Sequence, residues 1–254
     1  MEGSKMMRLQ NKIALVTGAS SGIGQGIAIA FASEGADVIV ADLSGPEAAT
    51  ETLSAIKAHG RRASYVQTDV ADEKSVSNLA RVAIDEFGRV DILVNNAGIF
   101  TESLIENLSV GDWDRVLNTN LRGTFLCIRA FINPMLERGE GRIINIASQL
   151  GQIGGGAVGH YSASKAGIIG LTKSLAREVS TRGVLVNAIA PGPIITPLLD
   201  SETEEWRSAK LAELPIGRFG RVDEVTPTAI LLASAEGSYY VGQTLGPNGG
   251  DVML

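Results

Sequence analysis

The chain has 254 residues, of which 44% are hydrophobic and 20% are charged, and its formal net charge is −6 at pH 7. This is a globular composition, and its acidic balance argues against a nucleic-acid surface. One cysteine excludes an internal disulfide framework, two histidines argue against a structural metal site, and no run of about 18 apolar residues predicts a membrane span. We therefore expect a cytoplasmic protein that uses no metal and binds neither nucleic acid nor membrane. The chain contains 30 glycines, a larger share of its 254 residues than the roughly 7% that is usual in proteins.

Short apolar runs alternate with longer amphipathic stretches along the chain, and no linker, repeat or low-complexity tract divides them. Near-continuous apolar runs are typical of strands covered on both faces of a parallel sheet. The repeated strand–helix–strand units predict one α/β domain, residues 1–254, with a doubly wound sheet. We expect strands at residues 12–17, 37–42, 62–67, 90–95, 142–147 and 184–189, and helices at about 22–34, 46–59, 72–87, 111–138 and 162–182.

The first expected strand is followed by a glycine-rich segment, TGASSGIG at residues 17–24. Ligands of doubly wound sheets bind beyond the carboxyl ends of the strands. Glycines let the backbone approach a pyrophosphate, and the next helix presents free N–H groups and its positive dipole end. The spacing is Gly-x-x-x-Gly-x-Gly, which differs from the general dinucleotide fingerprint, and a turn without a ligand is the alternative. We predict a phosphate site made by Gly18, Ser20, Ser21, Gly22, Ile23 and Gly24.

Asp42 and Leu43 follow the second strand, and Asp42 stands 20 residues beyond Gly22. A carboxylate at this place hydrogen-bonds the ribose 2′-hydroxyl of an adenosine and repels a 2′-phosphate. The chain has no Lys or Arg from Ile13 to Ile56, so this segment offers no cation to a 2′-phosphate. We therefore predict NAD(H) in preference to NADP(H). The alternative is an aspartate that only caps a turn.

Ser148 follows the fifth strand, Tyr161 comes thirteen residues later, and Lys165 comes four residues after Tyr161. Residues four apart share one face of a helix. An ammonium within about 4–6 Å stabilises a phenolate, so we expect the pKa of Tyr161 to fall below about 10 and the residue to act as a general acid or base. The Tyr-x-x-x-Lys spacing alone is more typical of an exposed helix face. After the sixth strand, the Pro-Gly-Pro sequence that starts at Pro191 predicts a turn and, by itself, nothing more.

These motifs, taken in order, resemble those of the classical short-chain dehydrogenase/reductase family from about Leu9 to the C-terminus. The resemblance rests on Thr17 to Gly24, Asp69, Asn95 to Gly98, Asn120, Ser148, Tyr161 to Lys165, and Pro191-Gly192. It implies a Rossmann-like fold with seven parallel strands in the order 3-2-1-4-5-6-7, with Gln243 to Leu245 in the seventh strand. It also implies a homotetramer.

The same resemblance implies a role for each site residue. Tyr161 would exchange a proton with the substrate oxygen, Ser148 would hydrogen-bond that oxygen, and Lys165 would hold the nicotinamide ribose and lower the pKa of Tyr161. Asn120 would anchor a water that links Lys165 to solvent. The remaining cofactor contacts would come from Asp69 and Val70 at the adenine, from Asn96, Ala97 and Gly98 at the adenosine ribose, and from Pro191, Gly192, Ile194 and Thr196 near the nicotinamide carboxamide.

The substrate is expected to be a medium-sized secondary alcohol or ketone, oxidised or reduced with NAD(H). We expect a flap over the substrate at residues 198–216. The expected substrate contacts are Leu198 of this flap and, outside it, Ser148, Leu150 and Tyr161. The segment 149–160 holds five glycines, which would leave room there, and ends in His160, expected to be partly exposed. A 3-oxoacyl-[acyl-carrier-protein] reductase is an alternative, although residues 200–205 of the flap read DSETEE, four acids without a base. Arg129 and Arg138 on the long helix would then serve as docking cations. A non-catalytic nicotinamide-binding regulator is an alternative of another class.

Overall fold

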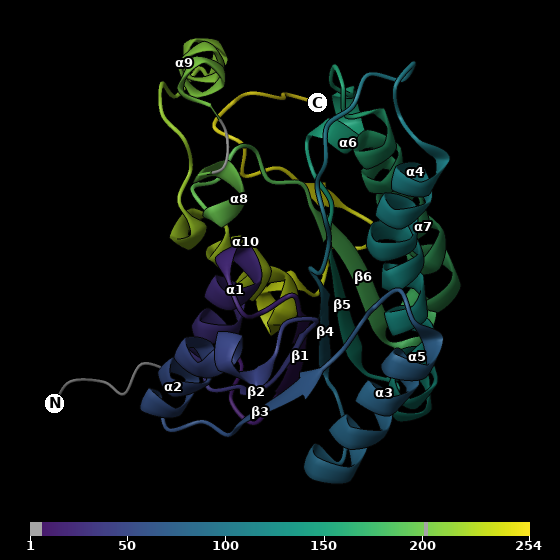
Figure 1. The fold of residues 1–254 in the computed structure, drawn as a ribbon. Helices are drawn as coiled ribbons and strands as arrows, with labels where there is room; N and C mark the ends of the chain where they lie inside the picture. The colour runs from purple at the N-terminus through teal and green to yellow at the C-terminus, as the bar shows by residue number, and fades with distance from the viewer. Residues whose placement is uncertain (1–6, 201–202) are drawn as a thin grey trace, which may run out of the picture.

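The computed structural model describes residues 7–200 and 203–254, without the side chain of Leu198. At its centre is a seven-stranded parallel sheet in the order β3-β2-β1-β4-β5-β6-β7, which confirms the predicted topology. Helices cover both faces of the sheet (Figure 1). The strands are β1 Ile13–Thr17, β2 Asp37–Asp42, β3 Ala63–Gln67, β4 Ile92–Asn95, β5 Gly141–Ile146, β6 Val184–Ile189 and β7 Thr244–Leu245.

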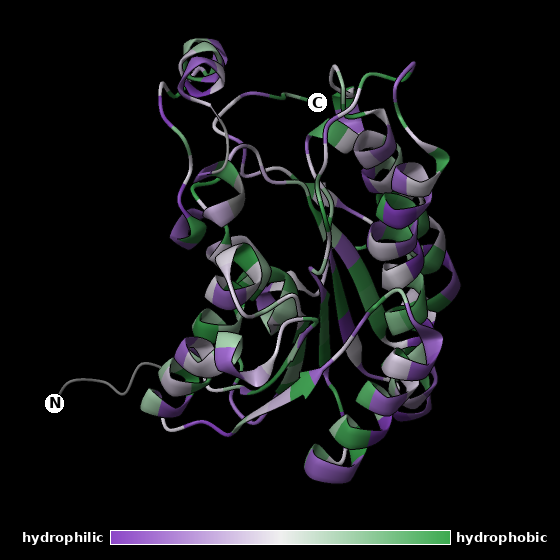
Figure 2. Cartoon of the chain, viewed as in Figure 1, coloured by the Kyte–Doolittle hydropathy of each residue, from purple (hydrophilic) through white to green (hydrophobic). Residues whose placement is uncertain are grey.

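The central strands are buried at nearly every position because each has helices on both sides. In β1, Ala14 and Val16 face one apolar cluster, whereas Ile13 and Leu15 face another. This alternation follows the two-residue period of a strand. Figure 2 shows the apolar strands between the two helical layers. Burial on both faces explains why these strands read as continuous apolar runs in the sequence.

One helical layer is formed by α1, α2 and α10, and the other by α3, α4, α5 and α7 (Figure 1). Helix α3 has the start and stop signals expected from the sequence, since Asp72 accepts a hydrogen bond from the Lys74 N–H and Gly88 ends the helix with φ of +78°. The helices are α1 Gly22–Ser33, α2 Thr50–Ala58, α3 Glu73–Phe87, α4 Val110–Leu117, α5 Gly123–Arg138, α6 Leu150–Ile153, α7 Gly159–Val179, α8 Pro197–Asp200, α9 Glu204–Glu213 and α10 Thr226–Ala233.

The expected single helix at 111–138 is wrong in one respect. A π-helical turn, Asn118–Arg122, stands between α4 and α5. Such turns insert one residue into a helix and occur often at functional sites. Hydrophobic periodicity does not reveal a one-residue insertion in a helix that continues on both sides, so the sequence gives no sign of it. The turn carries Asn120, whose side chain is fully buried.

Two segments for which the sequence predicts no helix contain short helices. Helix α6 follows Ser148, and the proposed flap contains α8 and α9. Helix α7 begins at Gly159, earlier than expected, so Tyr161 lies in its first turn. Among the described residues, no helix has the length and apolar character needed to cross a membrane.

Candidate active site

The glycine-rich loop after β1 packs tightly against the loop after β4. Asn96 donates hydrogen bonds from Nδ2 to the carbonyl oxygens of Thr17 at 3.0 Å and Gly18 at 2.9 Å. A Cβ on Gly24 would lie 2.2 Å from the Gly18 oxygen and 2.4 Å from Asn96 Nδ2. Gly18 itself has φ of +64°. These contacts require glycine at both positions, because a side chain would push the two loops apart.

The start of α1 has the properties of an anion site. Its N-cap residue, Ser21, makes no side-chain hydrogen bond to the first turn, so its hydroxyl does not occupy the free N–H groups there. The hydroxyl of Ser20 is buried without a hydrogen-bond partner. Gly22 has φ of +57°, and no acidic residue lies in the first turn of α1. Free amides, an unpartnered hydroxyl and a glycine-rich loop fit the phosphates of a dinucleotide.

Asp42 lies at the end of β2 against this loop. Its Oδ2 accepts a hydrogen bond from the Ser20 N–H at 3.0 Å, and its Oδ1 accepts one from the Ser44 N–H at 3.0 Å. The carboxylate therefore caps its own turn, which is the alternative that the sequence left open, and also contacts the glycine-rich loop. Its contact with a ribose stays a prediction. Leu43 is exposed, whereas the Ile23 side chain is partly buried and packs against the core.

The loops after β3 and β4 lie at the same edge of the sheet. Asp69 accepts a hydrogen bond from the Ala71 N–H at 2.8 Å, and Val70 is buried against α5, where a Cβ on Gly123 would lie 2.8 Å from Val70 Cγ2. The N–H of Ala97 donates to Thr17 Oγ1 at 3.0 Å, as does the N–H of Asn96 at 3.1 Å. These bonds hold the loops together, and the expected contacts with adenine and ribose stay predictions.

Tyr161 and Lys165 lie on one face of α7, as their spacing predicts. Lys165 Nζ is 5.6 Å from the centre of the Tyr161 ring and donates a hydrogen bond to the carbonyl oxygen of Ile146, the last residue of β5, at 2.8 Å. The Phe100 ring meets the Tyr161 ring edge-on at 4.9 Å. The Ser148 hydroxyl interacts with the phenol of Tyr161 and accepts a hydrogen bond from the Leu150 N–H at 3.1 Å. The structure thus brings Ser148, Tyr161 and Lys165 together.

The pKa of Tyr161 differs from the sequence expectation in this structure. Burial raises the pKa of Tyr161, and the hydrogen bond with Ser148 only partly opposes that rise. Burial also lowers the pKa of Lys165 from 10.5 to about 8. The expected lowering of the Tyr161 pKa by Lys165 is therefore not found, because the same burial that places the two groups side by side disfavours both charges.

Asn120 lies close to Lys165 and fixes the loop after β4. Its Oδ1 accepts from the Ile99 N–H at 2.8 Å, and its Nδ2 donates to the Ile99 carbonyl oxygen at 3.0 Å and to Ser164 Oγ at 3.1 Å. A Cβ on Gly98 would lie 3.1 Å from Asn120 Oδ1 and 3.6 Å from Lys165 Nζ. The side chain thus holds backbone in place, and its role as a water anchor stays a prediction.

The loop after β6 closes the site on the other side. Gly192 donates its N–H to the Pro247 carbonyl oxygen at 3.2 Å, and Pro191 accepts the N–H of Gln149 at 3.2 Å. Ile194 is buried and forms a β-bridge with Gly220. Thr196 approaches the start of α1, since a Cβ on Gly22 would lie 3.5 Å from Thr196 Cγ2. Of the predicted residues of this loop, Thr196 therefore lies beside the glycine-rich loop.

His160 is fully buried, and the expectation of a partly exposed residue is wrong. Its Nε2 pairs with Thr101 Oγ1 at 2.7 Å. The loop after β4 folds over the start of α7, where Ser103 also donates its N–H to the Ala157 carbonyl oxygen at 2.7 Å. Nothing in the local sequence signals this cover, because Thr101 is 59 residues away from His160.

The glycines after Ser148 serve two purposes. A Cβ on Gly151 would lie 2.7 Å from the Lys165 carbonyl carbon, so this glycine allows α6 to pack on α7. Gly154, Gly156 and Gly159 have open space around the Cβ position. The expectation that the five glycines leave room thus holds for these three but not for Gly151, nor for Gly155, where a Cβ would lie 2.8 Å from Val158 Cγ2.

The proposed flap buries much of its own apolar surface. Leu199, Leu214 and Phe219 are buried in one cluster, against which Trp206 and Leu211 pack. The sequence predicts that Leu199, Trp206, Leu211 and Leu214 of the flap shape the substrate pocket. In the structure these four pack with one another and with Phe219, and Leu214 also lines a cavity. The Leu198 side chain, the expected substrate contact, lies outside the described residues. A cavity of about 120 Å³ lies between the end of the flap and the loop after β6, and its lining includes Gly192, Ile194, Leu214, Ile216 and Asn248.

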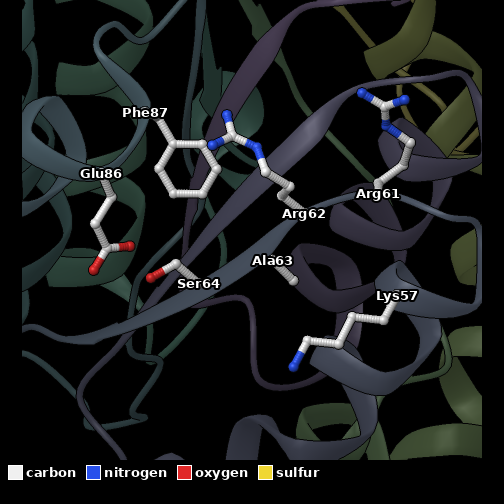
Figure 3. Close-up of a pocket in the computed structure, with 7 residues that line it drawn as sticks. All are labelled: Lys57, Arg61, Arg62, Ala63, Ser64, Glu86 and Phe87. Atoms are coloured by element: carbon white, nitrogen blue, oxygen red, sulfur yellow. The ribbon is translucent and has the colours of Figure 1, made fainter.

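A larger depression, about 390 Å³, lies away from these residues (Figure 3). It is next to Ala63, at the amino end of β3, whereas the site residues follow the carboxyl ends of strands. Its arginines already have partners, since Arg61 and Arg62 contact Asp37 at 2.9 and 2.7 Å and Arg62 stacks on Phe87 at 4.4 Å. We therefore place the functional site at the carboxyl edge.

The fold is a Rossmann-like doubly wound α/β fold, and Ser148, Tyr161 and Lys165 lie together at the carboxyl edge of its sheet. The model of the family described as short chain dehydrogenase matches residues 12–207. The chain belongs to this family, whose members are oxidoreductases that use nicotinamide cofactors.

Several relatives cover almost the whole chain. A 3-oxoacyl-[acyl-carrier-protein] reductase, FabG, of Staphylococcus aureus is 42% identical over 95% of this chain and 98% of its own length. The (2S)-[(R)-hydroxy(phenyl)methyl]succinyl-CoA dehydrogenase subunit BbsD of Thauera aromatica is 39% identical over 96% and 98%. The crystal structure of a putative short-chain alcohol dehydrogenase from Sinorhizobium meliloti has a TM-score of 0.93 and 37% identity, covering 97% of this chain and 98% of its own. Relatives that are about equally similar to this chain are thus named for different substrates.

Proposed function

We propose that this protein is an NAD-dependent alcohol dehydrogenase or ketone reductase that acts on a secondary alcohol or ketone. The observation that carries the proposal is the position of Tyr161, which lies between Ser148 and Lys165 at the carboxyl edge of the sheet. At one substrate oxygen, Tyr161 would donate or accept the proton and Ser148 would donate a hydrogen bond. The buried ammonium of Lys165 would lie beside Tyr161.

The cofactor would be held by the loops at this edge. The free amides at the start of α1 would bind its phosphates, and Asp42 would bind the adenosine ribose. Lys165 would bind the nicotinamide ribose. Bound there, the nicotinamide supplies or accepts the hydride at the substrate carbon. The carboxylate of Asp42 and the absence of Lys and Arg between Ile13 and Ile56 support NAD(H) over NADP(H).

The chain's own residues handle the proton. In reduction, Tyr161 donates its phenolic proton to the ketone oxygen while the Ser148 hydroxyl donates a hydrogen bond to it; in oxidation, Tyr161 accepts the proton of the alcohol. The ammonium of Lys165 stabilises the phenolate that reduction leaves behind. With a pKa of about 8, Lys165 is mainly protonated at neutral pH, so this stabilisation is available there.

A flap at residues 198–216 would cover the substrate, because α8 and α9 extend from the loop after β6 (Figure 1). A homotetramer would cover apolar side chains on the outer helices, including Val110 of α4 at 76% exposure and Phe125 of α5 at 45%. Sedimentation of the purified chain tests this assembly, and a monomer at micromolar concentration would contradict it.

A 3-oxoacyl-[acyl-carrier-protein] reductase is the second candidate, supported by the 42% identity with the Staphylococcus aureus enzyme. The surface favours it less. Arg129 pairs with Glu73 at 2.9 Å, and Arg138 donates to the Val90 carbonyl oxygen at 2.7 Å, so both candidate docking cations already have partners. Asp200, Glu204 and Glu205 in the flap would repel an acidic carrier.

A panel of secondary alcohols with NAD⁺ and of ketones with NADH, followed at the NADH absorbance, tests the proposal. We expect turnover with small free substrates. Turnover of a carrier-bound 3-oxoacyl group alone would favour the second candidate. NADH binding without turnover of either class would favour a non-catalytic nicotinamide-binding regulator.

A further inference from the structure

The C-terminal segment after β7 runs back to the candidate site. In Figure 1 this yellow segment passes between α9 of the flap and α6, which follows Ser148. Pro247 accepts the N–H of Gly192, and Gly249 accepts the N–H of Ile216, each at 3.2 Å. The segment therefore contacts the loop after β6 and the end of the flap.

Asp251 joins two parts of the site that are far apart in the sequence. Its Oδ2 lies 2.7 Å from Lys210 Nζ on α9, and its Oδ1 accepts a hydrogen bond from the same ammonium at 3.0 Å. The Nε2 of Gln149 donates a hydrogen bond to Oδ2 as well. Gln149 directly follows Ser148, so one carboxylate links the flap to the segment that carries the substrate-binding serine.

The contact between Asp251 and its two partners is largely shielded from solvent, which makes its loss costly. The Asp251 side chain is 8% exposed, that of Lys210 is 19% exposed, and Gln149 is buried. Removing one partner of a buried ion pair leaves the other charge uncompensated, which is strongly unfavourable. Lys210 also contacts Glu213 at 3.1 Å, but Glu213 is 65% exposed, and exposed pairs contribute little. The same lysine therefore has one strong partner and one weak partner.

The backbone around Asp251 is shaped to present it. Gly249 and Gly250 have φ of +67° and +86°, values that favour glycine. Asn248 accepts the Gly250 N–H at 3.0 Å and donates from Nδ2 to the Val252 carbonyl oxygen at 2.8 Å. This turn holds the segment before and after Asp251, so the carboxylate is positioned by local hydrogen bonds as well as by its partners.

We propose that Asp251 is a positioning residue that clasps α9 to the Ser148 segment and so holds the flap over the substrate. The proposal deepens the proposed function, since the flap and the role of Ser148 belong to it. The side-chain contacts of Asp251 lie on Gln149 and Lys210, neither of which is assigned to the cofactor, so we expect the clasp to affect substrate binding and not NADH binding. Breaking it should free α9 and weaken substrate binding without changing the proton-transfer group.

The first test needs no turnover. Hydrogen exchange of the amides in residues 204–213 is measured in the full-length chain without ligands for the wild type, Asp251→Ala and Glu213→Ala. We expect exchange of α9 to rise by roughly tenfold in Asp251→Ala and to stay unchanged in Glu213→Ala, the control that removes the exposed partner of the same lysine. Unchanged exchange in Asp251→Ala would overturn the clasp, whether or not the protein is an alcohol dehydrogenase.

The second test separates KM from kcat. We expect Asp251→Ala to raise the KM for the alcohol or ketone by roughly tenfold with the NADH Kd unchanged, and to lower the unfolding midpoint because Lys210 loses its least exposed partner. Lys210→Met should raise the KM by a similar factor. The double variant should raise it no further than either single variant, because each of the three variants removes the same Asp251–Lys210 ion pair. Additive effects, or a loss confined to kcat, would overturn the proposal. If Asp251→Ala does not fold, Asp251→Asn, which keeps the size of the side chain, gives the same readout.

A wild type that turns over no alcohol or ketone would overturn the proposed function and leave the exchange result standing. Turnover by the wild type, together with unchanged α9 exchange in Asp251→Ala, would support the proposed function and overturn the clasp. The two failures are therefore distinguishable.

Discussion

The ammonium of Lys165 lies 5.6 Å from the centre of the Tyr161 ring and donates a hydrogen bond to the Ile146 carbonyl oxygen at 2.8 Å. The lysine is thus anchored to the end of β5 while it faces the tyrosine from one turn further along α7. This places a buried cation beside a buried phenol, and the proton chemistry of the site depends on it.

Tyr161→Phe removes the only atom of this side chain that can exchange a proton. We expect turnover to fall by about 10²–10⁴-fold, the usual contribution of a general acid or base. The affinity for NADH, measured by fluorescence titration, should change little because the ring remains. Retained turnover would show that another group transfers the proton.

Replacement of Lys165 should stabilise the chain at neutral pH. Burial lowers the pKa of Lys165 to about 8, a cost of roughly 3 kcal/mol to the folded state while the unfolded lysine is protonated. This destabilisation is complete below pH 8 and disappears as the pH rises to 10.5, because between these values the unfolded chain binds more protons. Lys165→Met loses one hydrogen bond, about 1 kcal/mol, so the net gain at pH 7 is about 2 kcal/mol.

Urea unfolding of the chain without ligands at pH 7 and at pH 10 measures this gain, which should shrink or reverse at the higher pH. Lys173→Met on the exposed face of the same helix is the control, and it should show no such dependence on pH. An equal effect of Lys165→Met at both pH values would contradict the lowered pKa.

Asp42 should decide between the two nicotinamide cofactors through its charge. Asp42→Asn keeps the size of the side chain and removes the charge, and its amide oxygen can still accept from one of the two N–H groups, of Ser20 and Ser44, that Asp42 binds. We expect the ratio of kcat/KM for NADP⁺ to that for NAD⁺ to rise by about tenfold or more in both Asp42→Asn and Asp42→Ala. A rise in the alanine variant alone would assign the preference to shape, and no change in either would remove Asp42 from the ribose site.

Gly24→Ala should weaken cofactor binding. A Cβ at this position would lie 2.2 Å from the Gly18 carbonyl oxygen, so the loop must move, at a typical cost of about 1–3 kcal/mol. We expect the NADH Kd to rise by about tenfold or more. The matched control is Gly170→Ala in α7, where nothing lies within 4 Å of the added atom. Equal NADH affinity in both variants would separate Gly24 from the cofactor site.

Much of the fold follows from local sequence. The strands appear within one or two residues of their expected bounds because a buried parallel strand requires a continuous apolar run, and α3 has the caps that Asp72 and Gly88 predict. The order of the strands came from the family resemblance, which the sheet confirms. The spacing of Tyr161 and Lys165 indicated a shared helix face, since that periodicity is local.

The sequence could not show contacts between residues far apart in the chain. The burial of His160 depends on Thr101, and the cluster of flap residues depends on how α8 and α9 fold back. The pKa of Tyr161 rises because burial outweighs the nearby Ser148 hydrogen bond, a balance that spacing does not reveal. Residue types and spacing thus determine which groups the site can contain, whereas burial and distant partners, which exist only in the folded chain, set their charges and bring Asp251 to Gln149.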